Sequence, residues 1–267
     1  MSLRSMVDRA NVRLRKQPGL GCGAVALAAA LLSPVMACAA TGPSVCLDQA
    51  NPFYHIDRAV ALAVGSIDHV TPRFITIDTR DGSDALNAQK PKFFARLASR
   101  CDLVMGFPVE TGYPTLPEGV KATQPYAATG FVIAALGSAP GNFATLPPKS
   151  TVGVTYLTVP TTYFGSGHGT VLAEHQYSSP AAELAALQSH EIDAALIWQP
   201  WLNQHLAAHP AAISQRLLTQ PHAKWSMVAL YRPTPASHRV AVQFDRAIRQ
   251  LTTSGRLQRL IAPYNLP

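Results

Sequence analysis

The alternation of apolar, strand-like runs with helical patterns in the first part of the chain constrains the fold most strongly. Three short runs are β-branched or apolar throughout, and apolar residues recur at helical spacing in the two stretches between them. Strands that are apolar on both faces are typical of a parallel sheet covered by helices. This order of elements therefore predicts an α/β fold. The strands are expected at 44–48, 73–77 and 102–107, and the helices at 57–67 and 91–99.

A second α/β pattern begins at Thr151, after a β-like run over 129–135. Ser179 and Pro180 suit the cap and the first position of a helix, with Glu183 in its first turn. Stretches that are polar or rich in Gly and Pro are expected to be loops, at 79–89, 108–119 and 137–150. Further strands are expected at 151–159, 170–177, 192–197 and 226–230, and helices at 179–189, 198–208, 239–252 and 256–262, with a short helix opened by Pro160.

The first 40 residues have the layout of a secretory signal peptide. Five basic residues and one acid lie within residues 1–17, an apolar run of 14 residues occupies 19–32, and small residues follow at 37–40. An apolar run of this length is short for a membrane span. We therefore expect a periplasmic protein, cleaved near Ala39 or Ala40. An uncleaved anchor and a lipid attached to Cys38 are less well supported alternatives.

The charge balance argues against a nucleic-acid partner. The chain carries 22 Lys and Arg residues against 15 Asp and Glu residues, a net charge of +7. Removing residues 1–40 takes away five of the basic residues and one of the acids, which leaves a net charge of about +3. No block of basic residues interleaved with aromatics remains. Hydrophobic residues make up 48% of the chain and charged residues 14%, so it can fill a core and is not disordered.

Two cysteines, Cys46 and Cys101, remain after the export segment is removed. Disulfides persist in exported proteins, so we predict that these two cysteines pair. The bridge would close a loop of about 55 residues. Two buried thiols are the alternative. A cysteine nucleophile is less well supported, because no partner histidine can be placed from the spacing.

Residues suited to catalysis or metal binding do not converge in the sequence. His205 and His209 are four apart on a predicted helix, but no third ligand is near them. The glycine-rich stretch 165–169 lacks the P-loop lysine and the GxGxxG spacing, and no GxSxG is present. We therefore expect no metal, no organic cofactor and no enzymatic activity. Three aspartates at strand edges are interpreted as turn or ladder-end residues: Asp48, Asp102 and Asp193.

The loops that follow strand ends are the remaining candidates for a function. Ligands of open α/β sheets bind beyond the carboxyl ends of the strands. Here these loops offer aromatic rings, hydroxyl groups and a helix start, which suit a small ligand. The alternative is that Phe53, Tyr54 and Trp198 are packing residues. The candidate ligand-binding residues are Asn51, Phe53, Tyr54, Pro108, Val109, Glu110, Tyr126, Thr161, Thr162 and Trp198.

Several motifs, taken in order, resemble type II periplasmic solute-binding proteins, the cluster that includes binders of polar amino acids. The motifs are VCLDQANPFY, RLASRCDLVMG, ATQPYAATGFVIA, STVGV, SSPAAELAALQSHEIDAALIW and IAPYNLP, and they cover nearly the whole mature chain. VCLDQANPFY, RCDLVMGFP and IDAALIWQPW also resemble the solute-binding-like proteins associated with quinoprotein (PQQ-dependent) alcohol dehydrogenases of methanol oxidation systems. The positions of Cys46 and Cys101 fit that subgroup.

The resemblance implies the type II periplasmic binding protein fold, with two α/β lobes joined by two crossover strands. Lobe 1 would comprise residues 43–130 plus 230–267, and lobe 2 residues 131–229. Closure of the lobes would trap a ligand between them.

Two departures from the amino-acid binders bear on the ligand. The resemblance implies an Arg after the third strand for the ligand's carboxylate and an Asp at the end of a second-lobe strand for its ammonium group. Residues 115–121 contain no Arg, and Trp198 stands at the Asp position. A zwitterion would leave its charges poorly paired, so an amino-acid ligand is not expected. Trp198 favours an apolar or aromatic ligand, or a cleft filled by the protein itself.

The expected function is that of a non-enzymatic, monomeric periplasmic binding protein. It would either deliver a small solute to an ABC permease or serve as an accessory to a periplasmic quinoprotein dehydrogenase. The alternatives are an amino-acid ABC transporter binding protein and an enzyme, such as a dehydratase or deaminase, on the same fold.

Overall fold

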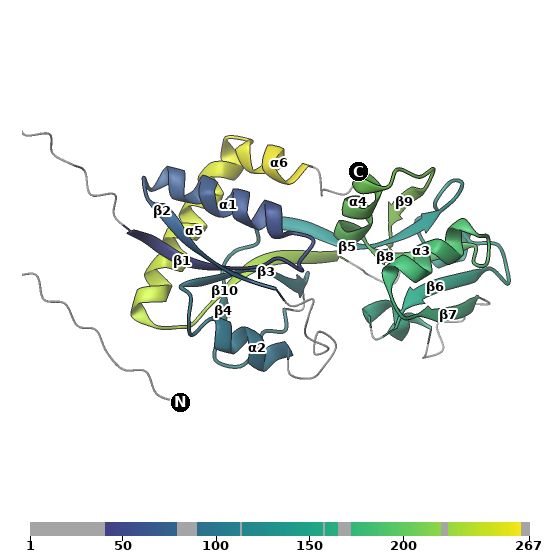
Figure 1. Cartoon of the computed structure of the whole chain (residues 1–267), viewed down its shortest axis with the longest axis horizontal. Helices are drawn as coiled ribbons and strands as arrows, with labels where there is room; N and C mark the ends of the chain where they lie inside the picture. The colour runs from purple at the N-terminus through teal and green to yellow at the C-terminus, as the bar shows by residue number, and fades with distance from the viewer. Residues whose placement is uncertain are drawn as a thin grey trace, which may run out of the picture. The chain divides into compact units, whose positions relative to one another are not determined.

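Figure 1 shows the computed structural model of the chain. The structure describes residues 41–78, 90–112, 114–156, 158–164, 172–219 and 224–262. The predicted export segment therefore lies outside the described residues. So do the predicted loop 79–89, the glycine-rich stretch 165–169 and the last five residues. Within the described residues, no helix is both long enough and apolar enough to cross a membrane.

The first half of the sheet is built around three parallel strands. The three predicted strands are present, as β1 (Thr41–Asp48), β2 (Thr71–Ile77) and β3 (Leu103–Glu110), and they are parallel as expected. β1 lies between the other two. β10 (Lys224–Tyr231) pairs antiparallel to β3, and the short β4 (Lys121–Ala122) adds to β10. We call these strands the first half-sheet.

β5 (Ala127–Ala135) continues from the first half-sheet into a second one. Its residues up to Gly130 pair with β10, and its residues from Phe131 onward pair with β8 and β9. The parallel strands β6 and β7 extend the second half-sheet beyond β8. The strands of the second half-sheet are β6 (Thr151–Thr155), β7 (Ala173–Tyr177), β8 (Ala194–Trp198) and β9 (Ser214–Leu217).

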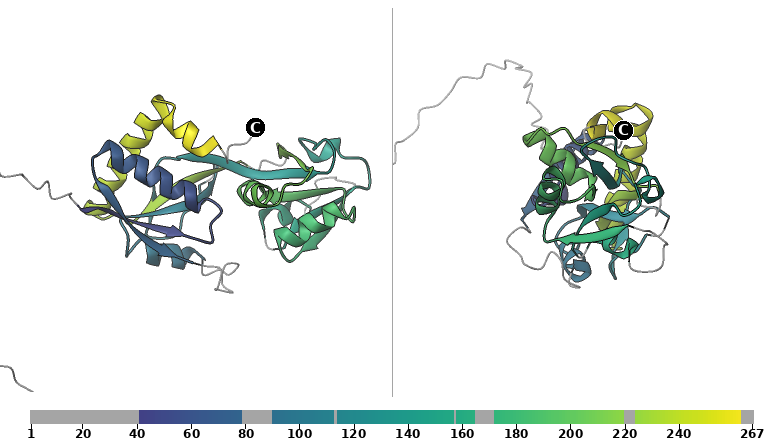
Figure 2. Two further views of the ribbon diagram at one scale, coloured as in Figure 1. Left: turned by 45° about the horizontal axis from the view of Figure 1, so that its top comes forward. Right: turned by 90° about the vertical axis from the view of Figure 1, so that its right-hand side faces the viewer.

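Helices cover both faces of the first half-sheet (Figures 1 and 2). Side chains alternate along β3, so Leu103 and Met105 face one core and Val104 faces the other. An irregularity in the pairing with β10 interrupts this alternation, so Val109 faces the same core as Val104. The first core is closed by three helices and the second by one. These helices are α1 (Tyr54–Ile67), α5 (Pro235–Thr253) and α6 (Arg256–Ile261) on the first core, and α2 (Lys90–Leu97) on the second.

The second half-sheet is covered on one face by α3 (Pro180–Gln188) and α4 (Gln199–Ala208). Its other face packs on two short 3-10 helices, η2 (Phe143–Thr145) and η3 (Val159–Tyr163). The predicted start of α3 is confirmed: the Ser179 hydroxyl accepts a hydrogen bond from the Ala182 N–H, and Pro180 opens the helix.

Glu183, in the first turn of α3, is fully buried instead of facing solvent as a first-turn acid usually does. Gly153 of β6 leaves room for it, since a Cβ there would lie 3.1 Å from the Glu183 Cγ. The Thr155 hydroxyl donates a 2.7 Å hydrogen bond to one carboxyl oxygen. Burial, which penalises the charged form, raises the pKa of Glu183 to about 8.

Three details of the sequence prediction are wrong. The predicted strand 151–159 ends at Thr155, because η3 begins at Val159. Residues 108–110 were expected in a loop but extend β3, because pairing with β10 overrides the local Pro108 signal. β9 was missed because its sequence, SQRL, has one apolar residue.

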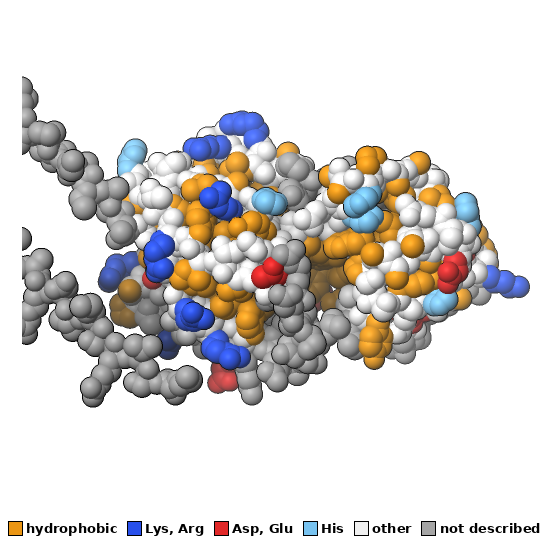
Figure 3. Space-filling view, in the orientation of Figure 1, with side chains coloured by type: hydrophobic (Ala, Val, Ile, Leu, Met, Phe, Trp, Pro, Cys, Tyr) orange, Lys and Arg blue, Asp and Glu red, His pale blue; other side chains and the backbone are white. Residues whose placement is uncertain are grey.

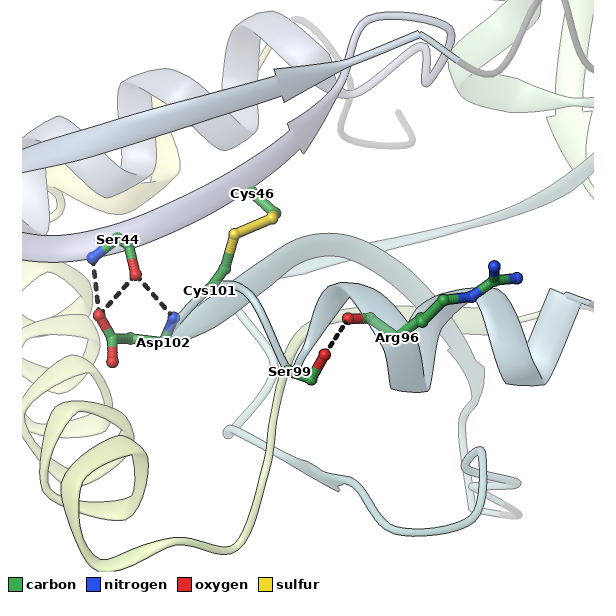
Figure 4. Close-up of a disulfide and its surroundings, with 6 residues drawn as sticks. All are labelled: Ser44, Cys46, Arg96, Ser99, Cys101 and Asp102. Atoms are coloured by element: carbon green, nitrogen blue, oxygen red, sulfur yellow. Dashed lines mark hydrogen bonds between the residues drawn. A yellow bond between two sulfur atoms is a disulfide. The ribbon is translucent and has the colours of Figure 1, made fainter.

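Cys46 and Cys101 form a disulfide, which confirms the predicted pair (Figure 4). The bridge ties β1 to the turn that leads into β3. Beside it, Asp102 accepts hydrogen bonds from both the N–H (2.8 Å) and the hydroxyl (2.7 Å) of Ser44, and its own N–H donates to the Ser44 hydroxyl. Asp193, just before β8, likewise accepts from the Thr151 N–H at 2.8 Å. Both aspartates thus hold the amino ends of neighbouring strands together, as predicted for ladder-end residues.

Candidate functional site

The crossover between the half-sheets brings together the carboxyl ends of several strands. β1 and β3 are parallel, so Asp48 and Glu110 end at one edge, and the parallel pair β6 and β8 ends at Thr155 and Trp198. β5 and β10 also pass through this region. The pairing of β5 with β10 stops at Gly130, and its pairing with β8 starts at Phe131. Beyond the carboxyl ends of strands is where open α/β sheets take up ligands.

A row of side chains crosses four strands at this point. Glu110 of β3 lies directly opposite Trp225 of β10, and Trp225 lies opposite Thr129 of β5. Directly opposite residues of antiparallel strands project from the same face. Two residues further along β5, Phe131 lies opposite Trp198 of β8. Because side chains two apart on a strand share a face, these residues project from one face of the sheet.

The aromatic rings in this row contact one another. The centroids of Phe131 and Trp198 are 5.1 Å apart, and those of Trp198 and Trp225 are 6.1 Å apart with their planes nearly perpendicular. Offset and edge-to-face contacts of this kind are the favoured arrangements of aromatic pairs. Phe131 is buried, whereas the two indoles are partly exposed. Trp198 packs against the cores of both half-sheets and remains partly exposed.

Tyr163, the last residue of η3, joins this surface. Burial, and then the charge of Glu110, raise the pKa of Tyr163 to about 12, so the phenol stays protonated at physiological pH. The side chain is 7% exposed, and its hydroxyl has no hydrogen-bond partner among the described residues. A buried polar group without a partner costs about 1–3 kcal/mol. We call Glu110, Phe131, Tyr163, Trp198 and Trp225 the junction cluster.

Thr129 and Gln199 form a buried hydrogen bond next to the cluster. Both are fully buried, and the Thr129 hydroxyl donates to the Gln199 side-chain oxygen at 3.2 Å. Gln199 is the first residue of α4 and follows Trp198 directly. The bond therefore ties the crossover strand to the point where β8 turns into its helix.

A second set of polar residues near the end of β3 is structural. Gly106 adopts φ +77°, and its carbonyl accepts a 2.9 Å hydrogen bond from the Asn51 side chain. Its N–H donates to the Tyr126 hydroxyl at 2.9 Å, which in turn donates to Asp57 at 2.6 Å. Asp57 and Tyr126 are almost completely buried, and desolvation raises the pKa of Asp57 to about 7. Asn51 and Tyr126 thus direct polar atoms toward the backbone of Gly106 within β3.

The other predicted site residues lie at varied positions. Phe53 is completely buried in the first core, and Tyr54, the first residue of α1, is partly buried. Val109 is buried on the face opposite Glu110 and Trp225, and Pro108 lies inside β3. The hydroxyls of Thr161 and Thr162, both in η3, each donate a hydrogen bond to the backbone carbonyl three residues earlier in the chain.

Glu110 and Trp198 are therefore the two predicted residues that the structure brings into the junction cluster. The sequence analysis missed Phe131, Tyr163 and Trp225. Tyr163 is adjacent to two predicted threonines, and Trp225 immediately precedes a predicted strand. Their type and place were thus visible in the sequence, but their convergence depends on strand pairing. No group of three or more potential metal ligands occurs among the residues with described positions.

Basic side chains are unevenly distributed over one face of the molecule. On the face shown in Figure 3, Lys and Arg side chains lie apart from one another over the half that carries α1, α5 and α6. Few basic side chains are seen over the half that carries α3 and α4.

Comparisons with known proteins identify the architecture. No protein-family model matches the sequence, and no curated protein does. Solved structures do match. The second substrate-binding domain of a putative amino acid ABC transporter from Streptococcus pneumoniae is 16% identical, with a TM-score of 0.63 over 83% of this chain and 98% of that one. The L-cystine solute receptor of Neisseria gonorrhoeae, in its unliganded open conformation, is 17% identical, with a TM-score of 0.62 over 83% and 92%.

The substrate-binding domain 2 of GlnP from Lactococcus lactis, also in an open conformation, has a TM-score of 0.63 at 12% identity and covers 83% of this chain and 93% of that one. At these identities the likeness concerns the fold alone. The chain therefore has the two-lobed α/β fold of type II periplasmic binding proteins.

Proposed function

We propose that the protein is a non-enzymatic periplasmic solute-binding protein that holds a small ligand at the junction cluster and delivers it to an ABC permease. The observation that carries this proposal is the cluster itself. Two partly exposed indoles, a carboxylate and an unpaired buried hydroxyl converge where the carboxyl ends of the strands meet. Apolar and aromatic side chains combined with a few polar groups are typical of the lining of small-molecule sites.

We place the lobes of this binding protein by strand pairing. β5 changes its partner between Gly130 and Phe131, and this change of partner supports our placing the first boundary there. β10 pairs with β3 from Trp225 onward, so we set the second boundary near Lys224 instead of 230. The periplasmic location rests on the predicted signal peptide, and the disulfide suits an oxidising compartment.

The comparisons favour a role in ABC transport over a role beside a quinoprotein dehydrogenase. The solved structures above are described as substrate-binding proteins or solute receptors, and none is described as dehydrogenase-associated. The accessory role rests on the sequence motifs alone. An enzyme is a weaker proposal, because Asp193 holds the amino end of β6 at the opposite edge from the junction cluster and supplies no second carboxylate beside Glu110.

A thermal melting panel tests the proposal. Amino acids, amines, alcohols, organic acids, sugars, pyrroloquinoline quinone and metal ions would each be added to the purified protein. A ligand at 100 times its dissociation constant stabilises the folded state by about 2.7 kcal/mol, which raises the melting temperature by roughly 5–10 °C. We expect a specific shift with one chemical class. A flat panel would contradict solute binding and favour the accessory role.

A further inference from the structure

We propose that the junction cluster binds an organic cation, an amine or quaternary ammonium group attached to an apolar or aromatic body. This inference rests on the proposed function, since it names the chemical class of ligand for the same site. It follows from the charge, the rings and the lone hydroxyl that the cluster presents.

The charge on this surface is negative and uncompensated among the described residues. No hydrogen bond or ion pair joins the Glu110 side chain to any of them. Lys224 is next to Trp225 in β10, so its side chain projects from the opposite face of the sheet. Thr111 follows Glu110 and Ser226 follows Trp225, and the hydroxyl groups of these two residues lie 3.0 Å apart. Neither hydroxyl carries a positive charge that could neutralise Glu110.

The described basic residues of the second half-sheet lie elsewhere. Lys149 precedes the amino end of β6, the end away from the cluster. Arg216 of β9 lies opposite Ile133, and its side chain passes Gly141. A ligand carboxylate at the cluster would therefore meet Glu110 with no cation from these residues to pair with it.

The rings supply a matching attraction. A cation within about 6 Å of an aromatic centroid is drawn to the ring face, most strongly to that of Trp. Trp198 and Trp225 contact each other edge to face, so a ligand would not sit between them but would lie over the partly exposed surface of the indole pair. Glu110, directly opposite Trp225, would add the ionic contact. The protonated Tyr163 hydroxyl, which lacks a partner among the described residues, would hydrogen-bond to the ligand.

Calorimetric titration with three compounds that share a phenyl ring tests the charge preference. They are phenethylamine, a cation; L-phenylalanine, which adds a carboxylate to it; and 3-phenylpropionate, an anion. Choline and its uncharged carbon analogue 3,3-dimethylbutan-1-ol form a second matched pair. We expect phenethylamine to bind at least 10-fold more tightly than L-phenylalanine, and choline more tightly than its analogue.

Variants assign the preference to Glu110. Glu110→Gln removes the charge at nearly constant size and should weaken binding of the cation at least 10-fold, whereas Glu110→Asp should retain most of it. Glu174→Gln is the matched control: it removes one carboxylate from β7, the far edge strand of the sheet. It should leave the affinity unchanged. Melting temperatures without ligand verify that each variant is folded.

The possible outcomes distinguish failure of the cation proposal from failure of the proposed solute-binding function. Equal or tighter binding of L-phenylalanine or 3-phenylpropionate would overturn the cation proposal while solute binding stands. Cation binding that survives Glu110→Gln unchanged would also overturn it. If neither these probes nor the wider melting panel gives any binding, the proposed function itself fails.

Discussion

Gly106 shows how a single residue shapes the strand that carries Glu110. Its φ of +77° is strained for any other residue, and a Cβ there would lie 2.5 Å from both the Asn51 amide nitrogen and an Asp57 carboxyl oxygen. We expect Gly106→Ala to lower the free energy of unfolding by about 2–4 kcal/mol, combining backbone strain with the loss of buried hydrogen bonds. Urea unfolding measures this.

Gly112→Ala is the control for that substitution. Gly112 also has a positive φ, +93°, but a Cβ there would meet nothing within 4 Å. Gly112→Ala should lower the free energy of unfolding by only about 1–2 kcal/mol, because only the backbone strain contributes. Equal losses in the two variants would contradict the importance of the polar network around Gly106.

Asp57 makes stability depend on pH. Its pKa is raised from 3.8 to about 7 in the folded protein, because burial outweighs the hydrogen bond from Tyr126. A raised pKa means that the folded state binds the proton more tightly, so the stabilisation is complete below pH 4 and is lost as pH rises through 7. Each tenfold difference in proton affinity is worth about 1.4 kcal/mol, so the loss is at most about 4 kcal/mol.

Asp57→Asn keeps an oxygen that can accept the Tyr126 hydrogen bond but cannot ionise. We expect its unfolding free energy to fall less than that of the wild type between pH 5 and pH 8. Some dependence should remain, because the pKa of Glu183 is raised in the same direction, to about 8. Parallel pH profiles for the two proteins would show that Asp57 does not titrate in this range.

At the scale of elements, the disulfide and the Ser44–Asp102 bonds fix β1 against β3. Replacing both Cys46 and Cys101 by Ala should lower the free energy of unfolding by about 4 kcal/mol, since the bridge closes a loop of 55 residues. Guanidinium unfolding of the oxidised wild type and the double variant measures the loss. A difference below about 1 kcal/mol would show that the bridge adds little.

Most elements could be predicted from the sequence, because their apolar periodicity is local. The helix start at Ser179 and the disulfide pair were predicted and are confirmed. β9 was missed because its four residues carry no strand pattern, and the end of β3 was missed because its pairing partner is more than a hundred residues away. The burial of Glu183 depends on the space that Gly153 leaves in another element.

The candidate site was harder to predict for the same reason. Its five residues come from β3, β5, η3, β8 and β10, and only the register of those strands brings them together. Residue type and position after a strand were enough to find Glu110 and Trp198. They also selected Phe53 and Tyr126, whose side chains are buried in the first core.

At the scale of the whole molecule, the fold is that of substrate-binding proteins, but its ligand has to be argued from the site. Two of the three tryptophans lie in the junction cluster, and the third, Trp201, lies on α4 stacked on His205. Trp201→Phe therefore leaves an emission signal that comes from the cluster alone.

Fluorescence titration of the Trp201→Phe protein with the compound that stabilises it most in the melting panel is the most direct test of binding at the junction cluster. We predict a saturable change in emission, with an affinity that falls at least 10-fold when Trp198 is also replaced by Leu. A ligand that stabilises the protein but leaves the emission unchanged, and binds the Trp198→Leu variant equally well, would place the binding site elsewhere.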